Sequence, residues 1–219
     1  APSSTPIDLG TGRTAVAASV GQHHTCAILD NGDMKCWGHN NQGQLGNGGV
    51  GSVTAVVSPP STPIDLGTGR TAVALSAGDS HTCAILDNGD MKCWGYDASG
   101  QLGDGGSNTN ANAPSSTAID LGTGRTAVAI TGGLRHTCAI LDNGDVKCWG
   151  RDNNGQLGDG GTNTDTNAPS STAIDLGTGR TAVAVHAGFS HTCAILDNGD
   201  MKCWGCLLYT SPSPRDTVR

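Results

Sequence analysis

Nine cysteines are present, and eight of them fall into four pairs with one constant spacing. The pairs are Cys26 with Cys36, Cys83 with Cys93, Cys138 with Cys148, and Cys193 with Cys203. Each pair flanks the tripeptide Asp-Asn-Gly, and Asn-Gly between two apolar stretches is a strong β-hairpin signal. Two thiols on facing strands can form a disulfide, or they can act as ligands of a soft metal ion.

The register of the hairpin decides whether the disulfide can form. With a three-residue loop at 30–32, the glycine takes the left-handed bulge position and Cys26 faces Cys36. With a two-residue loop, Cys26 would face Trp37 and the two sulfurs would lie on opposite faces. The first register also gathers apolar side chains on one face, so we predict it. Directly opposed residues lie about 4.5–5.5 Å apart at Cα, which suits a disulfide.

One cross-strand disulfide per pair is therefore expected. Disulfides persist in oxidising compartments, so this pattern predicts a secreted or cell-surface protein. The alternative is eight reduced, buried cysteines that act as small hydrophobic side chains. Zinc is a further alternative, because His24, Cys26 and Cys36 supply three possible ligands, but the paired knuckles of structural zinc sites are missing.

Oxygen donors that could suit calcium occur at Asp30, Asn31 and Asp33, and at Asp104 and Asp159 in two Gly-Asp-Gly-Gly tracts. The order of an EF-hand is absent, since neither its glycine nor its twelfth-position Glu is in place. Asp and Asn are also common turn residues, because their side chains bond the nearby backbone. We predict no metal and no cofactor.

Catalytic function is not indicated. A catalytic site needs unlike residues that converge once, whereas the candidate polar residues here recur in every unit of the chain. The Gly-rich turn at 10–12 lacks the Lys-Ser/Thr pair of a phosphate loop, and no Ser stands in a nucleophile elbow.

The formal charge of −7 disfavours nucleic acid as a partner. No apolar run approaches the roughly 18 residues of a membrane span, so membrane insertion is not expected.

The elements that hold these residues repeat along the chain. Block Ser-Thr-(Pro/Ala)-Ile-Asp-Leu-Gly-Thr-Gly-Arg begins at Ser4, Ser61, Ser116 and Ser171. A block that starts His-Thr-Cys-Ala-Ile-Leu and ends Cys-Trp-Gly follows each time, and Gly-Gln-Leu-Gly follows three times. Each unit predicts four short strands, in the first unit at 7–9, 14–20, 25–29 and 34–37. Four strands per repeated unit are typical of propeller blades.

Gly-x-x-His-Thr, Asn-Gly, Cys-Trp-Gly and Gly-Gln-Leu-Gly, in this order, resemble the regulator of chromosome condensation repeat over residues 4–205. The resemblance implies a propeller that typically has seven blades. It also implies a role such as those of family members: a guanine-nucleotide exchange factor that binds chromatin, domains of ubiquitin ligases, and a bacterial inhibitor of β-lactamase. The predicted fold is all-β, a partial β-propeller of about four four-stranded blades in an incomplete ring.

Blade boundaries follow from the repeat. We expect one blade each at 1–60, 61–115 and 116–170, and a partial fourth blade at 171–205. Residues 206–219 match nothing that follows the other Trp-Gly pairs, and they resemble a translated sequencing adapter. We interpret this segment as a non-native tail and Cys206 as an accidental thiol.

Positions that differ between units are the predicted partner-binding positions, because varied loops on a fixed framework are natural contact sites. They are the residues before each repeat His: Gln22, His23, Asp79, Ser80, Leu134, Arg135, Phe189 and Ser190. The tracts 47–60, 104–115 and 159–170 also vary. Drift in unconstrained loops is the alternative.

One tryptophan per unit is expected to pack between adjacent sheets rather than form a carbohydrate platform; these are Trp37, Trp94, Trp149 and Trp204. The predicted function is a non-catalytic scaffold that binds a protein, or a glycan, through variable loops on one face. The alternatives are an intracellular exchange factor or chromatin adaptor, and the repeat domain of a larger enzyme such as a ubiquitin ligase.

Overall fold

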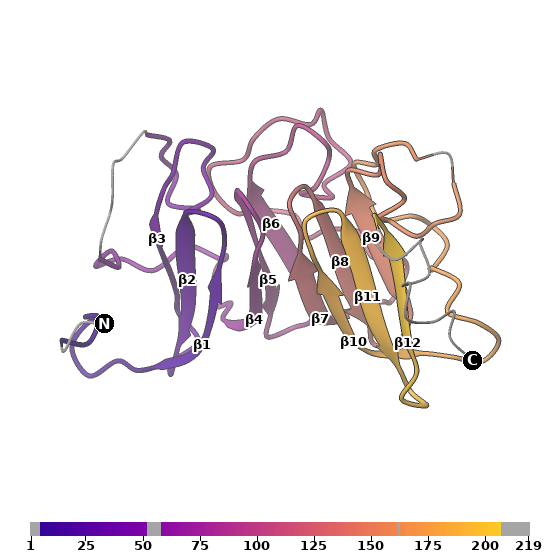
Figure 1. Ribbon diagram of the computed structural model, residues 1–219. Coiled ribbons are helices and arrows are strands. Elements are labelled where there is room, and N and C mark those ends of the chain that lie inside the picture. The colour runs from indigo at the N-terminus through magenta and orange to yellow at the C-terminus, as the bar shows by residue number, and fades with distance from the viewer. Residues whose placement is uncertain (1–4, 52–57, 162, 207–219) are drawn as a thin grey trace, which may run out of the picture.

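The computed structural model describes residues 5–51, 58–161 and 163–206. This part of the chain is all-β and forms four three-stranded antiparallel sheets, which stand side by side in an open arc (Figure 1). The sheets are called the first to fourth blades. The first holds β1 (Ala15–Val20), β2 (His24–Leu29) and β3 (Met34–Gly38); the second holds β4 (Ala72–Ala77), β5 (His81–Leu86) and β6 (Met91–Gly95); the third holds β7 (Ala127–Gly132), β8 (His136–Leu141) and β9 (Val146–Gly150); the fourth holds β10 (Ala182–Ala187), β11 (His191–Leu196) and β12 (Met201–Gly205).

The hairpin between β2 and β3 has the register expected from a three-residue loop. Leu29 N–H donates to the Asp33 carbonyl at 2.8 Å, and Cys26 lies opposite Cys36. Gly32 has a φ of +80°, the left-handed conformation that glycine adopts without steric cost. The same register recurs in the other three blades.

In all four blades the facing cysteines are joined by disulfides, with Cα–Cα distances of 4.0–4.1 Å. The bonds join Cys26 to Cys36, Cys83 to Cys93, Cys138 to Cys148, and Cys193 to Cys203. The two cysteines of each bond come from the second and third strands of one blade. Each disulfide is therefore a crosslink within a hairpin and not a bond between blades.

The expectation of four strands per blade is wrong for the described residues, since no strand forms at 7–9 or at its counterparts. The counterpart of 7–9 in the second repeat, residues 64–66, lies beside β3 of the first blade instead. Ile64 N–H donates to the Met34 carbonyl at 2.8 Å. Ile64 and Leu66 are buried whereas Asp65 is exposed, as in a strand. Pairing stops after one bond because the chain turns at once: Asp65 Oδ1 accepts the Gly67 N–H at 2.9 Å.

The hydrophobic core lies between neighbouring sheets. One face of the first blade packs against the opposite face of the second. The buried cluster at this junction contains Cys26, Ile28, Met34, Cys36, Leu45, Ile64, Leu66, Ala72, Ala84, Leu86 and Trp94. Equivalent clusters join the second blade to the third, with Cys83 and Cys93, and the third to the fourth, with Cys138 and Cys148. These three disulfides therefore contribute to the packing surface that each blade offers to the next one.

The repeat tryptophans pack between blades. Trp94 and Trp149 are completely buried, and each indole Nε1 donates to a carbonyl of the preceding unit, Gln44 or Gln101, at 3.1 Å. Trp204 makes the same bond at 2.9 Å. Trp37 is only half-buried, because no blade precedes it within the described residues.

A substitution of Gly103, the last residue of the second Gly-Gln-Leu-Gly block, would test this packing. Its φ is +76°, and an added Cβ would lie 2.3 Å from Trp149 Nε1. We expect Gly103→Ala to lower the free energy of unfolding by about 3 kcal/mol, of which about 1 kcal/mol is backbone strain and the rest overpacking. Urea unfolding would measure the change.

Gly105→Ala is the matched control. Gly105 has a φ of +70°, but a Cβ there would meet nothing closer than 4.0 Å. This variant should therefore lose only about 1 kcal/mol. Equal losses in the two variants would show that the indole contact does not hold the blades together.

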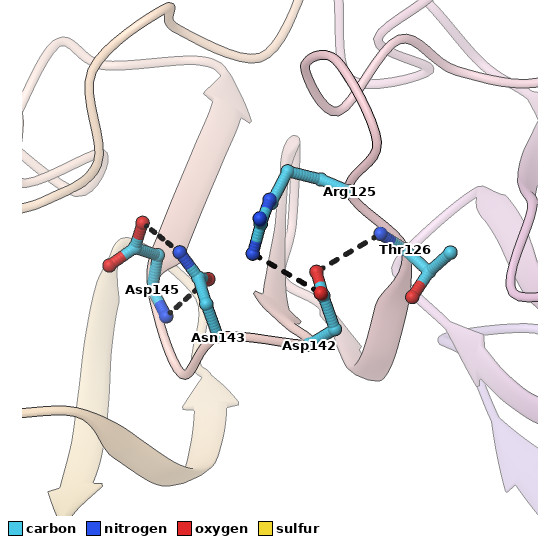
Figure 2. Close-up of polar contacts among 5 residues, drawn as sticks. All are labelled: Arg125, Thr126, Asp142, Asn143 and Asp145. Atoms are coloured by element: carbon cyan, nitrogen blue, oxygen red, sulfur yellow. Dashed lines mark hydrogen bonds and ion pairs between the residues drawn. The ribbon is translucent and has the colours of Figure 1, made fainter.

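Each hairpin loop carries polar contacts that account for its acidic residues. In the third blade, Asp142 accepts bonds from Thr126 N–H at 3.2 Å and from Arg125 Nη1 at 3.1 Å (Figure 2). Asn143 Nδ2 donates to Asp145 Oδ2 at 2.8 Å, and Asp145 N–H donates back to Asn143 Oδ1 at 3.1 Å (Figure 2). Asp30, Asn31 and Asp33 make the equivalent contacts in the first blade. Turn chemistry therefore occupies these side chains.

Candidate partner-binding face

The repeat histidines connect each blade to the next. His24 Nε2 lies 2.8 Å from Thr82 Oγ1, and Thr82 Oγ1 donates to the Gln44 carbonyl at 2.8 Å. Since the hydroxyl proton is used on that carbonyl, Nε2 must be the donor, and in a neutral ring Nδ1 is then unprotonated. The His81–Thr137 and His136–Thr192 pairs repeat the contact at 3.0 and 2.9 Å. In all three histidines Nδ1 is buried without a partner.

Burial keeps these rings neutral. Desolvation, and then the nearby His23 and His39, lower the pKa of His24 to about 4. Desolvation and the neighbouring repeat histidines lower the pKa of His81 to about 3, and desolvation and His191 lower that of His136 to about 4. The repeat histidines are thus hydrogen-bond donors of the framework.

The glycine of each Gly-x-x-His motif packs directly on the histidine ring. A Cβ on Gly78 would lie 2.2 Å from His81 Cε1, and one on Gly133 would lie 2.3 Å from His136 Cε1. Only glycine allows this approach. The two variable residues between glycine and histidine are therefore presented by a loop that is held at both ends.

A groove of about 310 Å³ lies where the inner strands β1, β4, β7 and β10 end. The first variable residue of every unit lines it. We call these the groove residues: Gln22, Asp79, Leu134 and Phe189. Phe189 and Val20, which also lines the groove, are 69% and 70% exposed, so this surface offers large apolar side chains to solvent.

The second variable residue of every unit lies outside the groove lining. The carbonyls of His23, Ser80, Arg135 and Ser190 accept backbone bonds from His39, Tyr96, Arg151 and Cys206 at 2.7–2.9 Å. The guanidinium of Arg135 lies 5.1 Å from the ring centroid of Tyr96, in the range of a cation–π contact. The His23 and His39 rings meet edge to face at 5.9 Å.

His39, Tyr96 and Arg151 were not among the predicted contact positions. A signal was present, because the residue after each Cys-Trp-Gly also differs from unit to unit. Their place beside the second variable residue follows from the pairing of His24 with Gly38 and its equivalents. This cross-strand neighbour is visible only once the register is known.

The floor of the groove is fixed by bonds between inner strands. Ser19 Oγ accepts the Ala77 N–H at 2.9 Å, and Ser76 Oγ accepts the Gly132 N–H at 2.9 Å. Thr131 Oγ1 makes the third such contact, with Ala187 N–H at 3.0 Å. These bonds tie neighbouring blades together at the level of the groove.

The variable tracts leave the blades at the same end as the groove, since they follow the C-terminal ends of β3, β6 and β9 (Figure 1). Residues 52–57 and 162 of these tracts, and 207–219 of the tail, lie outside the described residues. Cys206 is described and is an exposed, unpaired thiol. In the described ranges, no group of three or more His, Cys, Asp or Glu side chains is placed to hold a metal ion, and no helix could span a membrane.

Comparison with known proteins identifies the repeat. Residues 15–44, 72–101 and 127–156 match one profile described as the regulator of chromosome condensation (RCC1) repeat, and residues 31–85 and 143–195 match a second profile of that description. Together the matches cover most of the chain.

Two curated relatives and one solved structure illustrate the similarity. Human E3 ubiquitin-protein ligase HERC2 is 28% identical over 194 residues, which are 89% of this chain and 4% of that protein. Ultraviolet-B receptor UVR8 of Arabidopsis thaliana is 29% identical over 187 residues, 85% of this chain and 40% of the receptor. Yeast RCC1 (Prp20), solved bound to Kap60, superposes with a TM-score of 0.76 at 20% identity, over 91% of this chain and 45% of that one. The chain thus spans less than half the length of each.

Proposed function

Since the chain belongs to the regulator of chromosome condensation (RCC1) repeat family, we propose that it is a non-catalytic scaffold that binds a protein partner at the groove. The observation that carries the proposal is the convergence of the groove residues. A nearly constant framework brings the first variable position of all four units to one surface. Variable residues that a nearly constant framework gathers on one surface are suited to partner recognition.

The chemistry of the surface favours a protein partner. Leu134, Phe189 and Val20 supply apolar contact area, and Asp79 and Gln22 supply polar groups beside it. Apolar anchors surrounded by polar groups are typical of protein interfaces. A related propeller, yeast RCC1, has been solved with the protein Kap60 bound. A glycan platform has less support, because two repeat tryptophans are completely buried between blades.

We further propose a secreted or cell-surface location, on the basis of the four hairpin disulfides. An intracellular exchange factor or chromatin adaptor would keep the same thiols reduced. Alkylation of the protein at the moment of lysis, followed by mass spectrometry, separates the two: eight protected cysteines support the oxidising compartment, and eight alkylated ones contradict it.

The binding proposal can be tested by photo-crosslinking. A photoreactive amino acid at 134 or 189 should capture a partner from extracellular material, whereas the same group at Asn143, on a hairpin loop away from the groove, should not. The captured partner is then tested against the double variant Leu134→Ser with Phe189→Ser. We expect at least about a tenfold loss of affinity, since buried interface anchors contribute more than about 1 kcal/mol each.

The matched control for that affinity measurement is Asn143→Ser, which alters an exposed hairpin side chain. It should bind like the wild type. Equal capture from 134 and 143, or unchanged affinity of the double variant, would contradict the groove as the binding site.

A second candidate is the repeat domain of a larger enzyme. The match to HERC2, of which this chain spans 4%, favours it specifically. The complete open reading frame distinguishes the candidates, because only this one requires a catalytic domain on the same chain.

A further inference from the structure

The loop after Cys-Trp-Gly occurs three times in full, and the copies differ at two positions together. The first copy has Asn40 and, seven residues later, Asn47. The second copy has Asp97 and Asp104, and the third has Asp152 and Asp159 at the equivalent places. A pair of amides in one blade is thus a pair of carboxylates in the other two.

In the first blade the hydrogen-bonding groups of the buried Asn40 amide all have partners. Asn40 Oδ1 accepts the Leu45 N–H at 3.0 Å. Asn40 Nδ2 donates to Asn47 Oδ1 at 3.1 Å and to the Gly49 carbonyl at 2.9 Å. Both ends of the buried Asn40 amide therefore have partners, and one N–H group lies between the two side chains.

In the second blade that donor is missing. Asp97 Oδ1 accepts the Leu102 N–H at 2.9 Å, as Asn40 Oδ1 does with Leu45, so Asp97 Oδ2 takes the place of the amide nitrogen. Asp97 is 0% exposed, and Oδ2 is buried without any hydrogen-bond partner. The Asp104 carboxylate stands where Asn47 stood, and its Oδ1 accepts the Gly106 N–H at 2.8 Å. The pKa of Asp97 is raised to about 6. Burial is the largest cause; the bond from Leu102 N–H acts in the opposite direction, and the charge of Asp104 raises the pKa further.

A second buried polar atom in this loop also lacks a hydrogen-bond partner, and the cause is simpler. Gln101 Nε2 lacks a partner because Ala98 occupies the position of Asn41 and Asn153, whose Oδ1 atoms accept from the equivalent glutamines at 3.4 Å. No such substitution explains Asp97. Two facing carboxylates, one of them buried, are unfavourable unless a cation lies between them or one of them is protonated.

We propose that a calcium ion binds between Asp97 and Asp104, and a second one between Asp152 and Asp159. The ion lies between Asp97 Oδ2 and the Asp104 carboxylate, where the N–H of Asn40 Nδ2 points toward Asn47 Oδ1 in the first blade. Oxygen-only donors suit a hard cation, and the exposed Asp104 leaves room for water to complete the coordination shell. With two carboxylates per ion the affinity should be weak, on the order of 10⁻⁴–10⁻³ M, as in extracellular calcium modules.

The third blade has the equivalent acidic pair, with more negative charge around it. Asp152 Oδ1 accepts the Leu157 N–H at 2.8 Å, and Asp159 Oδ1 accepts the Gly161 N–H at 2.8 Å. In the second blade the Asp97 N–H donates to Asn110 Oδ1 at 3.0 Å. In the third blade an aspartate takes the place of that asparagine, and the Asp152 N–H donates to Asp165 Oδ1 at 2.9 Å. The extra charge should make this the tighter of the two sites.

The test uses the oxidised full chain, stripped with EDTA, at constant ionic strength. Isothermal titration with calcium chloride should give two sites, and about 10 mM calcium should raise the thermal midpoint by at least about 3 °C. The double variant Asp97→Asn with Asp104→Asn should lose one site, and Asp152→Asn with Asp159→Asn the other. These variants recreate the first blade's own pair, so they should fold without calcium.

The reverse variant, Asn40→Asp with Asn47→Asp, should gain a third site. The proposal is overturned if calcium binds the wild type no better than sodium does, or if the fourfold Asn variant keeps the calcium-dependent midpoint. A proton shared by Asp97 would instead make the midpoint depend on pH and not on calcium, which also overturns it.

Discussion

Complete reduction of the four hairpin disulfides is expected to unfold the protein at ambient temperature. Each disulfide closes a loop with a sequence separation of 10, for which chain entropy gives about 3 kcal/mol. Since the blades contribute nearly independently in a repeat array, four add up to roughly 12 kcal/mol. Native domains have only roughly 5–15 kcal/mol in total.

Far-UV circular dichroism and urea unfolding, with and without reductant, measure this effect. A thiol count must show eight additional thiols in the reduced sample beside Cys206. The control is the double variant Cys193→Ser with Cys203→Ser, which removes one disulfide from the terminal blade and should cost only about 3 kcal/mol. A fully reduced sample with an unchanged unfolding midpoint would show that packing between blades suffices without the crosslinks.

Mild acid is expected to destabilise the protein through its buried histidines. The pKa values of His24, His81 and His136 are lowered from 6.5 to about 4, 3 and 4, mainly by burial. The unfolded chain therefore binds more protons than the folded one below pH 6.5. Stability is fully present above pH 6.5 and is lost as the pH falls toward the folded pKa values. At pH 5 each histidine costs on the order of 2 kcal/mol, or roughly 6 kcal/mol for the three.

Urea midpoints between pH 7.5 and 4.5, in EDTA, measure this loss. Asp97 opposes it, because its pKa is raised to about 6 and its protonation favours the folded state as the pH falls. One carboxyl does not outweigh three histidines. His81→Gln should flatten the profile, and His186→Gln, at an exposed side chain of β10, is the matched control. A profile that stays level down to pH 5 would contradict the assignment of neutral, donor histidines.

Local patterns were sufficient to predict the hairpins. The three-residue loop at Asp-Asn-Gly was preferred because it gathers apolar side chains on one face, and it places Cys26 opposite Cys36, as the structure has it. One residue of slip would reverse the faces. The strand count was wrong for an equally local reason. Apolar alternation at 64–66 is genuine, but the Asp65 side chain bonds Gly67 and ends the pairing after one hydrogen bond.

Contacts between blades could not be derived from one unit. Nothing in the first repeat indicates that His24 bonds Thr82, or that the glycine of Gly-Gln-Leu-Gly receives an indole from the following blade. The same limit applies to the groove. Variation identified pairs such as Asp79 and Ser80, but only the tertiary structure shows that the first lines the groove and the second does not.

The sequence by itself thus determined the repeat, the all-β class, the cysteine register and the positions where units differ, because each depends on residues close together in the chain. The tertiary structure alone decided which variable residues share a surface and which buried groups lack partners. Those properties depend on how one blade packs on the next. Both sources of information were needed for the cysteine pairs. Their register follows from the hairpin loop, and their place in the core follows from packing against the neighbouring blade.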